Sequence, residues 1–241
     1  MTEYNSVNGS RVVVVGGGSR LGRAIALAAS ERGADIVVIG RSKTALDDVT
    51  KAASGRCDSI VADLSEPDSI VALGSTLGPF DHLISTVSMH ATGPLVDLTD
   101  DVVLNAFDAK VFGPMRLART TAPLVRPGGS FTFFSGQAAW KPSPGAVVTS
   151  TVNGALAFLV RALAVEYAPI RVNAVAPGIV DSGALDQLGD KKQEVLDRTA
   201  QHNPVGRVGT PEDLIDATLM LVTNGYMTGT VVHVDGGATL V

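Results

Sequence analysis

Cysteines, aromatic residues and runs of like charge are scarce in this chain of 241 residues. Cys57 is the only cysteine, so no disulfide can form within the chain, and a reducing compartment fits this composition. Aromatic residues make up 5% of the chain and include one tryptophan and three tyrosines. No block of like charges stands out, and the net charge of −5 argues against nucleic acid as a partner.

We find no pattern of a targeting signal or of a membrane-spanning segment in the sequence. The N-terminal residues MTEYNSVNGS are polar and lack the apolar core of a signal peptide. No apolar run is expected to reach the length that crosses a bilayer. We therefore predict a soluble cytoplasmic protein without a membrane partner. Its 45% apolar content is enough to build the core of one large domain.

A regular alternation of short β-branched runs and helical patterns fills the chain. Residues 12–15 are four valines, which is typical of a strand buried on both faces. A glycine-rich turn follows, then a helical pattern at about 20–31 and a second buried strand at 36–39. A strand, a helix and a strand within this length form a βαβ unit, so the two strands should be parallel.

The alternation continues to the end of the chain. We expect further helices near residues 43–53, 67–77, 100–124, from about 145 onward, and 211–222. We expect further strands near residues 58–62, 82–87, 130–135, 171–175 and 230–234. Thr210 is the expected N-cap of the last helix, with Pro211 at its first position.

One α/β domain over residues 1–241 accounts for this pattern. It is a doubly wound, Rossmann-type fold with a mainly parallel sheet of about seven strands and helices on both faces. A polar tail covers about 1–9, and a polar segment without a clear strand covers about 178–203, on the substrate side. Ligands of such sheets bind at the carboxyl ends of the strands, so the residues after each strand matter most.

The turn after the first strand reads GGGSRLG at residues 16–22. Glycines allow the backbone to approach a pyrophosphate, and the next helix offers free N–H groups and the positive end of its dipole. A plain turn is the alternative, but the βαβ context favours a dinucleotide site. The candidate contacts here are Gly16, Ser19, Arg20, Leu21 and Gly22.

The end of the second strand indicates which dinucleotide binds. An acidic residue there would hold a ribose 2′-hydroxyl, but the sequence is Gly40, Arg41 and Ser42. Arg41 can bind a 2′-phosphate through two N–H groups, and Arg20 lies at the facing turn. NADP(H) is therefore favoured over NAD(H). The alternative is that Arg41 is only a solvated surface residue.

The chain resembles the short-chain dehydrogenase/reductase family over roughly residues 10–238. The family motif T-G-x-x-x-G-x-G aligns with Val15, Gly16, Arg20 and Gly22, so its threonine and middle glycine are replaced. The segments RVNAVAPGIVDS, PVGRVGTPEDL and TGTVVHVDGG match the family closely. The resemblance implies a homo-oligomer, either a tetramer or a dimer.

Further cofactor contacts come from the resemblance alone. ADL at 62–64 is similar to the segment whose aspartate contacts adenine, and the strand-end motif N-N-A-G becomes STVS at 85–88. The segment at 171–182 implies residues beside the nicotinamide, with Ser182 where a carboxamide-binding threonine is usual. The implied contacts are Asp63, Leu64, Thr86, Pro177, Gly178, Ile179 and Ser182.

The resemblance implies hydride transfer between NADP(H) or NAD(H) and a carbonyl or alcohol. In the family, a tyrosine moves the hydroxyl proton, and a lysine four residues later lowers the tyrosine pKa and binds ribose. A serine polarises the carbonyl, and an asparagine on the preceding helix completes a proton relay. These four positions fall on Thr149, Asn153, Gly136 with Ser135 beside it, and Lys110.

The replacement residues make poor proton donors. A threonine hydroxyl is a far weaker acid than a phenol, whose pKa is about 10, and its side chain is shorter. We therefore expect Thr149 to be an ordinary helix-face residue, and the three tyrosines to lie remote from the pocket. His90 is a candidate acid or base, or a substrate contact, and Ser135 can still donate to a carbonyl. We expect Trp140 to pack over the pocket and Lys141 to be solvated; no metal-ligand spacing is present.

Lys110 and Asn153 exchange the residue types that the family has at these positions. In the family fold the two helices face each other, so the Lys110 ammonium could lie near the usual lysine site, with Asn153 bonded to it or to ribose. The alternative is drift after loss of catalysis, with Lys110 extending to solvent.

Two functions compete. The first is an NADP(H)-dependent oxidoreductase whose proton donor is water, His90 or Lys110. The second is a catalytically inactive NADP(H)-binding protein that acts as a sensor, a structural subunit or a member of a hetero-oligomer. A non-redox enzyme that reuses the pocket is a third, minor option.

Overall fold

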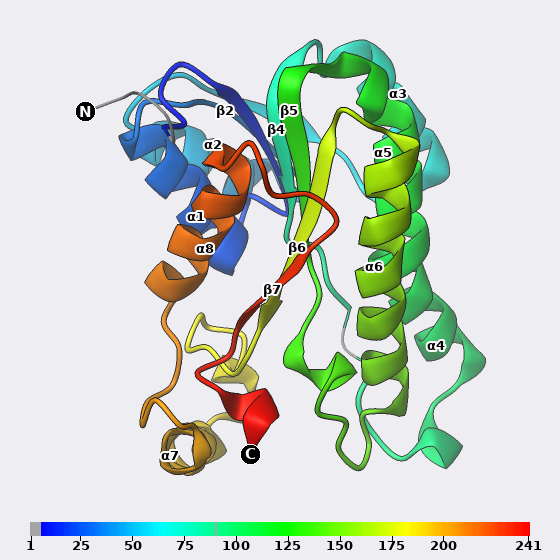
Figure 1. Cartoon of the computed structure of the whole chain (residues 1–241), viewed down its shortest axis with the longest axis vertical. Helices are drawn as coiled ribbons and strands as arrows, with labels where there is room; N and C mark the ends of the chain where they lie inside the picture. Colours follow the sequence, from blue (N-terminus) through cyan, green and yellow to red (C-terminus); the bar gives the residue numbers. More distant parts are fainter. Residues whose placement is uncertain (1–5, 90) are drawn as a thin grey trace.

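A central parallel sheet of seven strands organises the computed structural model, which describes residues 6–89 and 91–241. The strand order is β3-β2-β1-β4-β5-β6-β7, and every neighbouring pair runs parallel (Figure 1). The strands are β1 (Arg11–Val15), β2 (Asp35–Gly40), β3 (Cys57–Val61), β4 (Phe80–Ser85), β5 (Val125–Phe134), β6 (Arg171–Pro177) and β7 (Val231–Val234). This confirms the predicted fold class.

Helices cover both faces of the sheet (Figure 1). One face carries α1 (Arg20–Glu31), α2 (Lys43–Ala52) and α8 (Pro211–Thr223). The other face carries α3 (Pro67–Thr76), α5 (Gly113–Thr121) and α6 (Val147–Glu166). The remaining helices are α4 (Asp100–Phe107) and α7 (Lys191–His202).

The valines of β1 show why this sequence forms a central strand. Val12 and Val14 pack into the core on the α1 side, whereas Val13 and Val15 pack into the core on the α5 and α6 side. Successive side chains of a strand point to opposite faces, so both faces of a central strand must be apolar. All four side chains are almost fully buried.

The helix predicted at 100–124 is interrupted in its middle. A turn of π-helix at Asp108–Phe112 separates α4 from α5. Gly113 donates its N–H to the Asp108 carbonyl, five residues back. Pro114 has no N–H to donate to the Lys110 carbonyl, so the regular i−4 ladder cannot continue here. Lys110 therefore lies on an irregular turn.

The polar segment at 178–203 contains a helix that the sequence reading did not predict, α7. The segment makes only one isolated bridge among the described residues, between Val180 and Gly209. Lys192, on α7, lies 2.7 Å from Asp181 and 2.8 Å from Asp186. These ion pairs hold α7 against the chain that leaves β6. β5 also begins earlier than predicted, at Val125.

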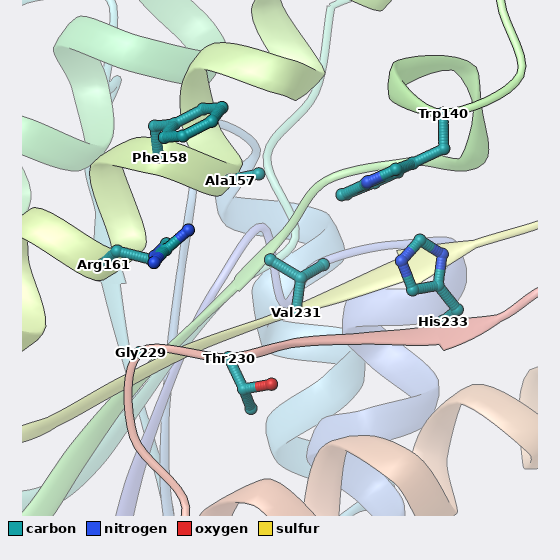
Figure 2. A pocket seen from close by; sticks show the side chains of 8 residues that line it. All are labelled: Trp140, Ala157, Phe158, Arg161, Gly229, Thr230, Val231 and His233. Atoms are coloured by element: carbon teal, nitrogen blue, oxygen red, sulfur yellow. The ribbon is translucent and has the colours of Figure 1, made fainter.

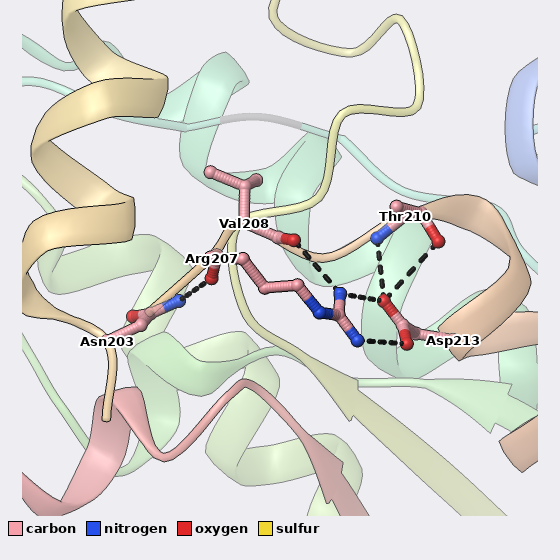
Figure 3. Close-up of polar contacts among 5 residues, drawn as sticks. All are labelled: Asn203, Arg207, Val208, Thr210 and Asp213. Carbon is pink, nitrogen blue, oxygen red and sulfur yellow. Dashed lines mark hydrogen bonds and ion pairs between the residues drawn. The ribbon is translucent and has the colours of Figure 1, made fainter. Parts of the chain in front are cut away.

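The start of α8 is fixed by a polar cluster (Figure 3). Thr210 and Asp213 form a capping box, and Pro211 occupies the first turn, as predicted. Arg207 places its two terminal nitrogens 2.6 and 2.8 Å from the Asp213 carboxylate, and Asn203 donates to the Arg207 carbonyl. The hydrogen bonds from Arg207 hold the pKa of Asp213 below its usual range.

The prediction that no segment reaches bilayer length was wrong for α6. Its 20 residues are long and apolar enough for a span, and 44% of the most apolar window is buried inside the protein. A core helix of a soluble protein can be equally long and equally apolar. In this fold α6 packs on the sheet, with Leu156 and Val160 in the core.

Candidate functional site

The turn after β1 is held so tightly that glycine is required at two positions. Gly16 and Gly17 both donate to the Ile39 carbonyl, at 2.8 and 3.2 Å, and Gly16 has a φ of +81°. A Cβ on Gly22 would collide with the Gly16 carbonyl oxygen and with Thr86 Oγ1. The first turn of α1 therefore packs directly against the turn after β1, with no room for a side chain between them.

Thr86, directly after β4, braces the same turn. Its N–H donates to the Val15 carbonyl at 3.0 Å, and its hydroxyl lies 3.2 Å from the same oxygen. The hydroxyl also fills the space beside Gly16 and Gly22. The structure thus brings three predicted cofactor positions together at the carboxyl ends of β1 and β4.

The N-terminus of α1 is open for an anion. Ser19 is its N-cap residue but makes no side-chain capping bond, and Ser19 and Arg20 are both exposed. Leu21 packs against the core instead. Arg20 has a φ of +46°, the only positive φ of a non-glycine residue within 6–89 and 91–241. Uncapped N–H groups at this end of a helix attract phosphate.

Arg41 and Asp63 lie near each other at the ends of β2 and β3. The pKa of Asp63 is lowered chiefly by the N–H of Ser65, and the charge of Arg41 adds to the shift. Ser42 accepts a bond from Ala45 and so caps α2. Arg41 itself is exposed, as a 2′-phosphate ligand must be.

The nicotinamide side follows β6. Pro177 ends this strand, and Gly178 donates to the Val234 carbonyl at 3.0 Å. A Cβ on Gly178 would lie 2.7 Å from Asp235 Cα, so this position also requires glycine. Ile179 and Ser182 continue the chain toward α7. By contrast, Leu64 buries its side chain in the core, which leaves only its backbone for a cofactor.

The positions of the family's tyrosine and serine carry no free donor. Thr149 gives its hydroxyl hydrogen to the Ala91 carbonyl at 3.0 Å, in line with an ordinary helix-face residue. Ser135 donates to the Asn153 carbonyl at 2.9 Å. A Cβ on Gly136 would lie 3.0 Å from Asn153 Nδ2, so this glycine allows the close approach of Asn153.

Lys110 is buried, which contradicts the alternative in which it extends to solvent. It is 5% exposed, and its Nζ donates to the carbonyl of Phe134 at 2.6 Å and lies 3.4 Å from that of Ser135. The irregular helical turn directs it at the end of β5. Burial lowers its pKa to about 8. Its described hydrogen bonds do not include Asn153, and a bond to ribose stays a prediction.

Asn153 fits a cofactor. It is 4% exposed, and its Oδ1 has no hydrogen-bond partner among the described residues. Buried acceptors are normally paired, so this oxygen is suited to a ligand hydroxyl. At the position of the family's ribose-binding lysine, it matches a ribose. Sequence reasoning missed Gln137 and Ser150, whose buried side-chain oxygens are likewise unpaired; no pattern in the sequence marks them.

The other candidates are spread out. His90 and Tyr4 lie outside the described residues. Tyr226 is 99% exposed, and Tyr167 packs at the core edge, far along α6 from Thr149. Lys141 was expected to be solvated; it is exposed, yet its Nζ donates to the Ala238 carbonyl at 2.8 Å.

A groove of about 370 Å³ lies between α6 and the free edge of β7 (Figure 2). Trp140 meets His233 edge-on, with ring centroids 4.3 Å apart, and Arg161 lies over the Phe158 ring. The groove is lined by residues of the middle of α6 and of β7, rather than by the strand ends that carry the cofactor positions. No sequence pattern predicted this groove.

A doubly wound parallel sheet with a glycine turn and an uncapped helix N-terminus defines a dinucleotide-binding protein. The family described as enoyl-(acyl carrier protein) reductase matches residues 16–239. The short-chain dehydrogenase/reductase malC of Malbranchea aurantiaca is 29% identical, covering 97% of this chain and 96% of malC. The chain belongs to the short-chain dehydrogenase/reductase family.

Solved structures agree with this assignment. The MalC reductase/Diels-Alderase matches with a TM-score of 0.92 and 27% identity, and covers 100% of both chains. A small-chain dehydrogenase in complex with NADPH matches with a TM-score of 0.81 and 33% identity, covering 97% of this chain and 100% of that one. The family is one of oxidoreductases that bind nicotinamide cofactors.

Proposed function

We propose that this protein is an NADP(H)-dependent oxidoreductase that transfers hydride between NADP(H) and a carbonyl or alcohol, with an atypical proton donor. The observation that carries the proposal is the end of β2, where exposed Arg41 and Ser42 stand in place of a carboxylate. A carboxylate there would repel a 2′-phosphate, whereas a guanidinium binds it. The NADPH complex of a structural neighbour supports this choice.

In this proposal the chain's own residues mainly position the cofactor and the substrate. The bound cofactor supplies the hydride, and hydride transfer depends on alignment of the two reacting carbons. The Asn153 Oδ1 would accept a hydrogen bond from a ribose hydroxyl, and Ser182 would hold the carboxamide. Lys110, with a pKa of about 8, carries a proton that it can release near neutral pH, directly or through water. His90 is the second candidate donor.

A second function is favoured by Thr149. Its hydroxyl is bonded to the Ala91 carbonyl, and Gly136 offers no side chain to polarise a carbonyl. The alternative is therefore an inactive NADP(H)-binding protein that serves as a sensor, a structural subunit or a partner in a hetero-oligomer.

We also propose a homo-oligomer, dimer or tetramer, in the cytoplasm, with a small-molecule substrate and without nucleic-acid or membrane partners. The outer face of α6 supports self-association. Val147, Phe158 and Val165 are 51%, 71% and 81% exposed and follow one another at near-helical spacing, with Gly154 between them. Burial of this apolar stripe against a second copy of the chain would stabilise a homo-oligomer.

A titration followed by an activity assay tests the proposal. Thermal unfolding is measured with NADPH and with NADH, and loss of absorbance of the reduced nicotinamide is then followed against a panel of carbonyls. Preference for NADPH with turnover supports the oxidoreductase. Tight NADPH binding without turnover on any carbonyl supports the inactive protein. If neither dinucleotide raises the melting temperature, both functions are rejected.

A further inference from the structure

Buried side-chain oxygens without a hydrogen-bond partner are concentrated where the turn after β5 packs against α6. Three of them are Gln137 Oε1, Ser150 Oγ and Asn153 Oδ1. Gln137 begins this turn, η4 (Gln137–Ala139), and the other two residues lie three positions apart on α6, on one side of the helix. The one other such oxygen among the described residues belongs to Thr132, within β5. The junction of η4 and α6 thus holds acceptors that the protein itself does not satisfy.

Ser150 differs from its two neighbours on α6 in what its hydroxyl contacts. Thr149 donates to the Ala91 carbonyl at 3.0 Å, and Thr151 donates to the Val147 carbonyl at 2.8 Å. The Ser150 hydroxyl makes neither kind of bond, although a serine in a helix can donate to the carbonyl four residues back. An unpaired buried polar atom costs free energy, so a ligand group that pairs with it would offset this cost.

The position of Gln137 places these oxygens at the ligand edge of the sheet. Gln137 follows Gly136 at the carboxyl end of β5, where ligands of parallel sheets bind. A Cβ on Gly136 would lie 3.6 Å from Asn153 Oδ1, so the two segments are in close contact there. Gln137 and Ser150 are only partly buried as residues, and a rotation of either side chain would turn its oxygen toward a bound molecule.

The groups around these oxygens favour a neutral ligand with hydroxyl groups. Lys110 Nζ bonds to the carbonyls of Phe134 and Ser135, so a positive charge lies close by and disfavours an ammonium ligand. A carboxylate only accepts hydrogen bonds and would leave Gln137 Oε1 unpaired. A hydroxyl group donates to that oxygen and can also accept from Ser150, which donates as well as accepts.

We propose that Gln137 and Ser150 determine substrate specificity by binding a hydroxyl group of the substrate, so that the protein acts on hydroxyketones or on the corresponding diols. The inference rests on the proposed function, in which Asn153 takes a ribose hydroxyl of the cofactor and leaves the other two oxygens for the substrate. On reduction the carbonyl carbon gains a hydride from NADPH and the carbonyl oxygen gains a proton, so a hydroxyketone becomes a diol. The bound hydroxyl is unchanged and only orients the substrate.

A complex with NADPH and an alcohol tests the proposal without requiring turnover. The reduced cofactor cannot oxidise an alcohol, so the two bind together and do not react. The matched pairs are butane-2,3-diol with butan-2-ol, and cyclohexane-1,2-diol with cyclohexanol. Calorimetric titration into the full-length protein saturated with NADPH should give each diol a Kd about tenfold lower than that of its simple alcohol, because the extra hydroxyl pairs with buried polar atoms.

Two substitutions remove the oxygens with little change in shape. Gln137→Met and Ser150→Ala should each raise the Kd of the diols severalfold, and the double variant should lose the preference for them. The Kd values of the simple alcohols and of NADPH should stay nearly unchanged. Without ligand, both variants should melt no lower than the original protein, because each loses a buried polar atom that has no partner. Thr151→Ala, on the exposed side of α6, is the control and should retain the preference.

The outcomes separate the inference from the proposed function. A preference for diols that disappears in the double variant supports the inference. If the original protein binds NADPH but binds each diol no more tightly than its simple alcohol, or if the double variant keeps the preference, the inference is overturned and the proposed function is unaffected. If the original protein binds no dinucleotide, the proposed function fails and the inference fails with it.

Discussion

Two turns of this molecule invite comparison, the one after β1 and the one after β5, because both lie at the ligand edge of the sheet. In the first, a Cβ on Gly22 would collide with backbone and with Thr86. In the second, Gly136 stands where the family has a serine, and Asn153 approaches it. Gly22 is required by the packing of α1 on the turn. Gly136 instead occurs together with replacements of the family's catalytic residues, such as Asn153 in place of lysine.

This difference shows which part of a site can change without loss of the fold. The candidate cofactor site is built from backbone contacts between β1, β4 and α1, so its shape should persist as long as the domain folds. The proton-transfer positions are single side chains on β5, α6 and the irregular turn before α5. They can be replaced one at a time, as Thr149 and Lys110 illustrate.

The largest effect is expected for Gly22→Ala. The added methyl has backbone on one side and a fixed hydroxyl on the other, so α1 must move. We expect a loss of about 3 kcal/mol in the free energy of unfolding and of most NADPH binding. Gly18→Ala is the control in the same turn, because its Cβ would find ordinary contacts at 3.4 Å. Equal melting temperatures for the two variants would show that the turn is less rigid than the contacts imply.

Lys110→Met tests the positions at which the family transfers a proton. Lysine has a pKa of 10.5, and burial lowers it to about 8 in the folded protein. The folded state therefore holds fewer protons between these values, so unfolding free energy rises with pH from about 8 to about 10.5 and the cost of the buried charge is full below pH 8. The rise amounts to about 3 kcal/mol.

The methionine variant should lack that rise, which pH-dependent chemical denaturation measures directly. At pH 7 it should be at least as stable as the original protein, because a buried charge has been removed. Its turnover of carbonyls should fall if Lys110 supplies the proton. Unchanged turnover would leave water or His90 as the donor, and an identical pH dependence in both proteins would show that Lys110 is not buried as described.

Asp213→Asn should have a smaller effect, remote from chemistry. Because the folded pKa of Asp213 is lowered, the stability it contributes is present above its unfolded pKa and is lost as pH falls below about 4. Arg207 is half exposed, so solvent limits the contribution to about 1 kcal/mol. Urea unfolding should show the full difference from the original protein at pH 7 and a smaller difference at pH 3, because the unfolded carboxylate has begun to bind a proton at pH 3 while the folded one is still largely ionised. Glu212→Gln, next to it and exposed, should behave like the original at both values.

The sequence predicted the elements whose signals are local. The valines of β1 alternate between two cores, and the cap at Thr210 needs only a few neighbouring residues. The π turn before α5 was missed, since it depends on which i−4 bond Pro114 removes within a helical pattern. α7 was missed because some of its contacts, such as that of Lys192 with Asp181, are with residues outside the helix itself.

The candidate site was predicted as a list of positions, and not as a set of bonds. Alignment placed Lys110 and Asn153 opposite each other. In the structure Lys110 donates to the carbonyl of Phe134, and the Asn153 Oδ1 has no hydrogen-bond partner among the described residues. A side chain's direction depends on the rotamer that packing allows, which no sequence spacing contains. The groove beside β7 joins residues 140, 158 and 233, which only the folded topology brings together.

Thr149→Val provides the smallest expected effect and the sharpest reading of the catalytic half. The substitution preserves shape and removes the hydroxyl that donates to the Ala91 carbonyl, so stability should fall by about 1 kcal/mol. NADPH affinity and turnover should be unchanged, because that hydrogen is already committed to the backbone. Steady-state rates across pH 6–9 are the measurement. Thr151→Val, on the exposed side of α6, is the control and should have no effect. If the rate collapses in Thr149→Val alone, Thr149 is a proton donor, and the replaced catalytic positions still carry out proton transfer.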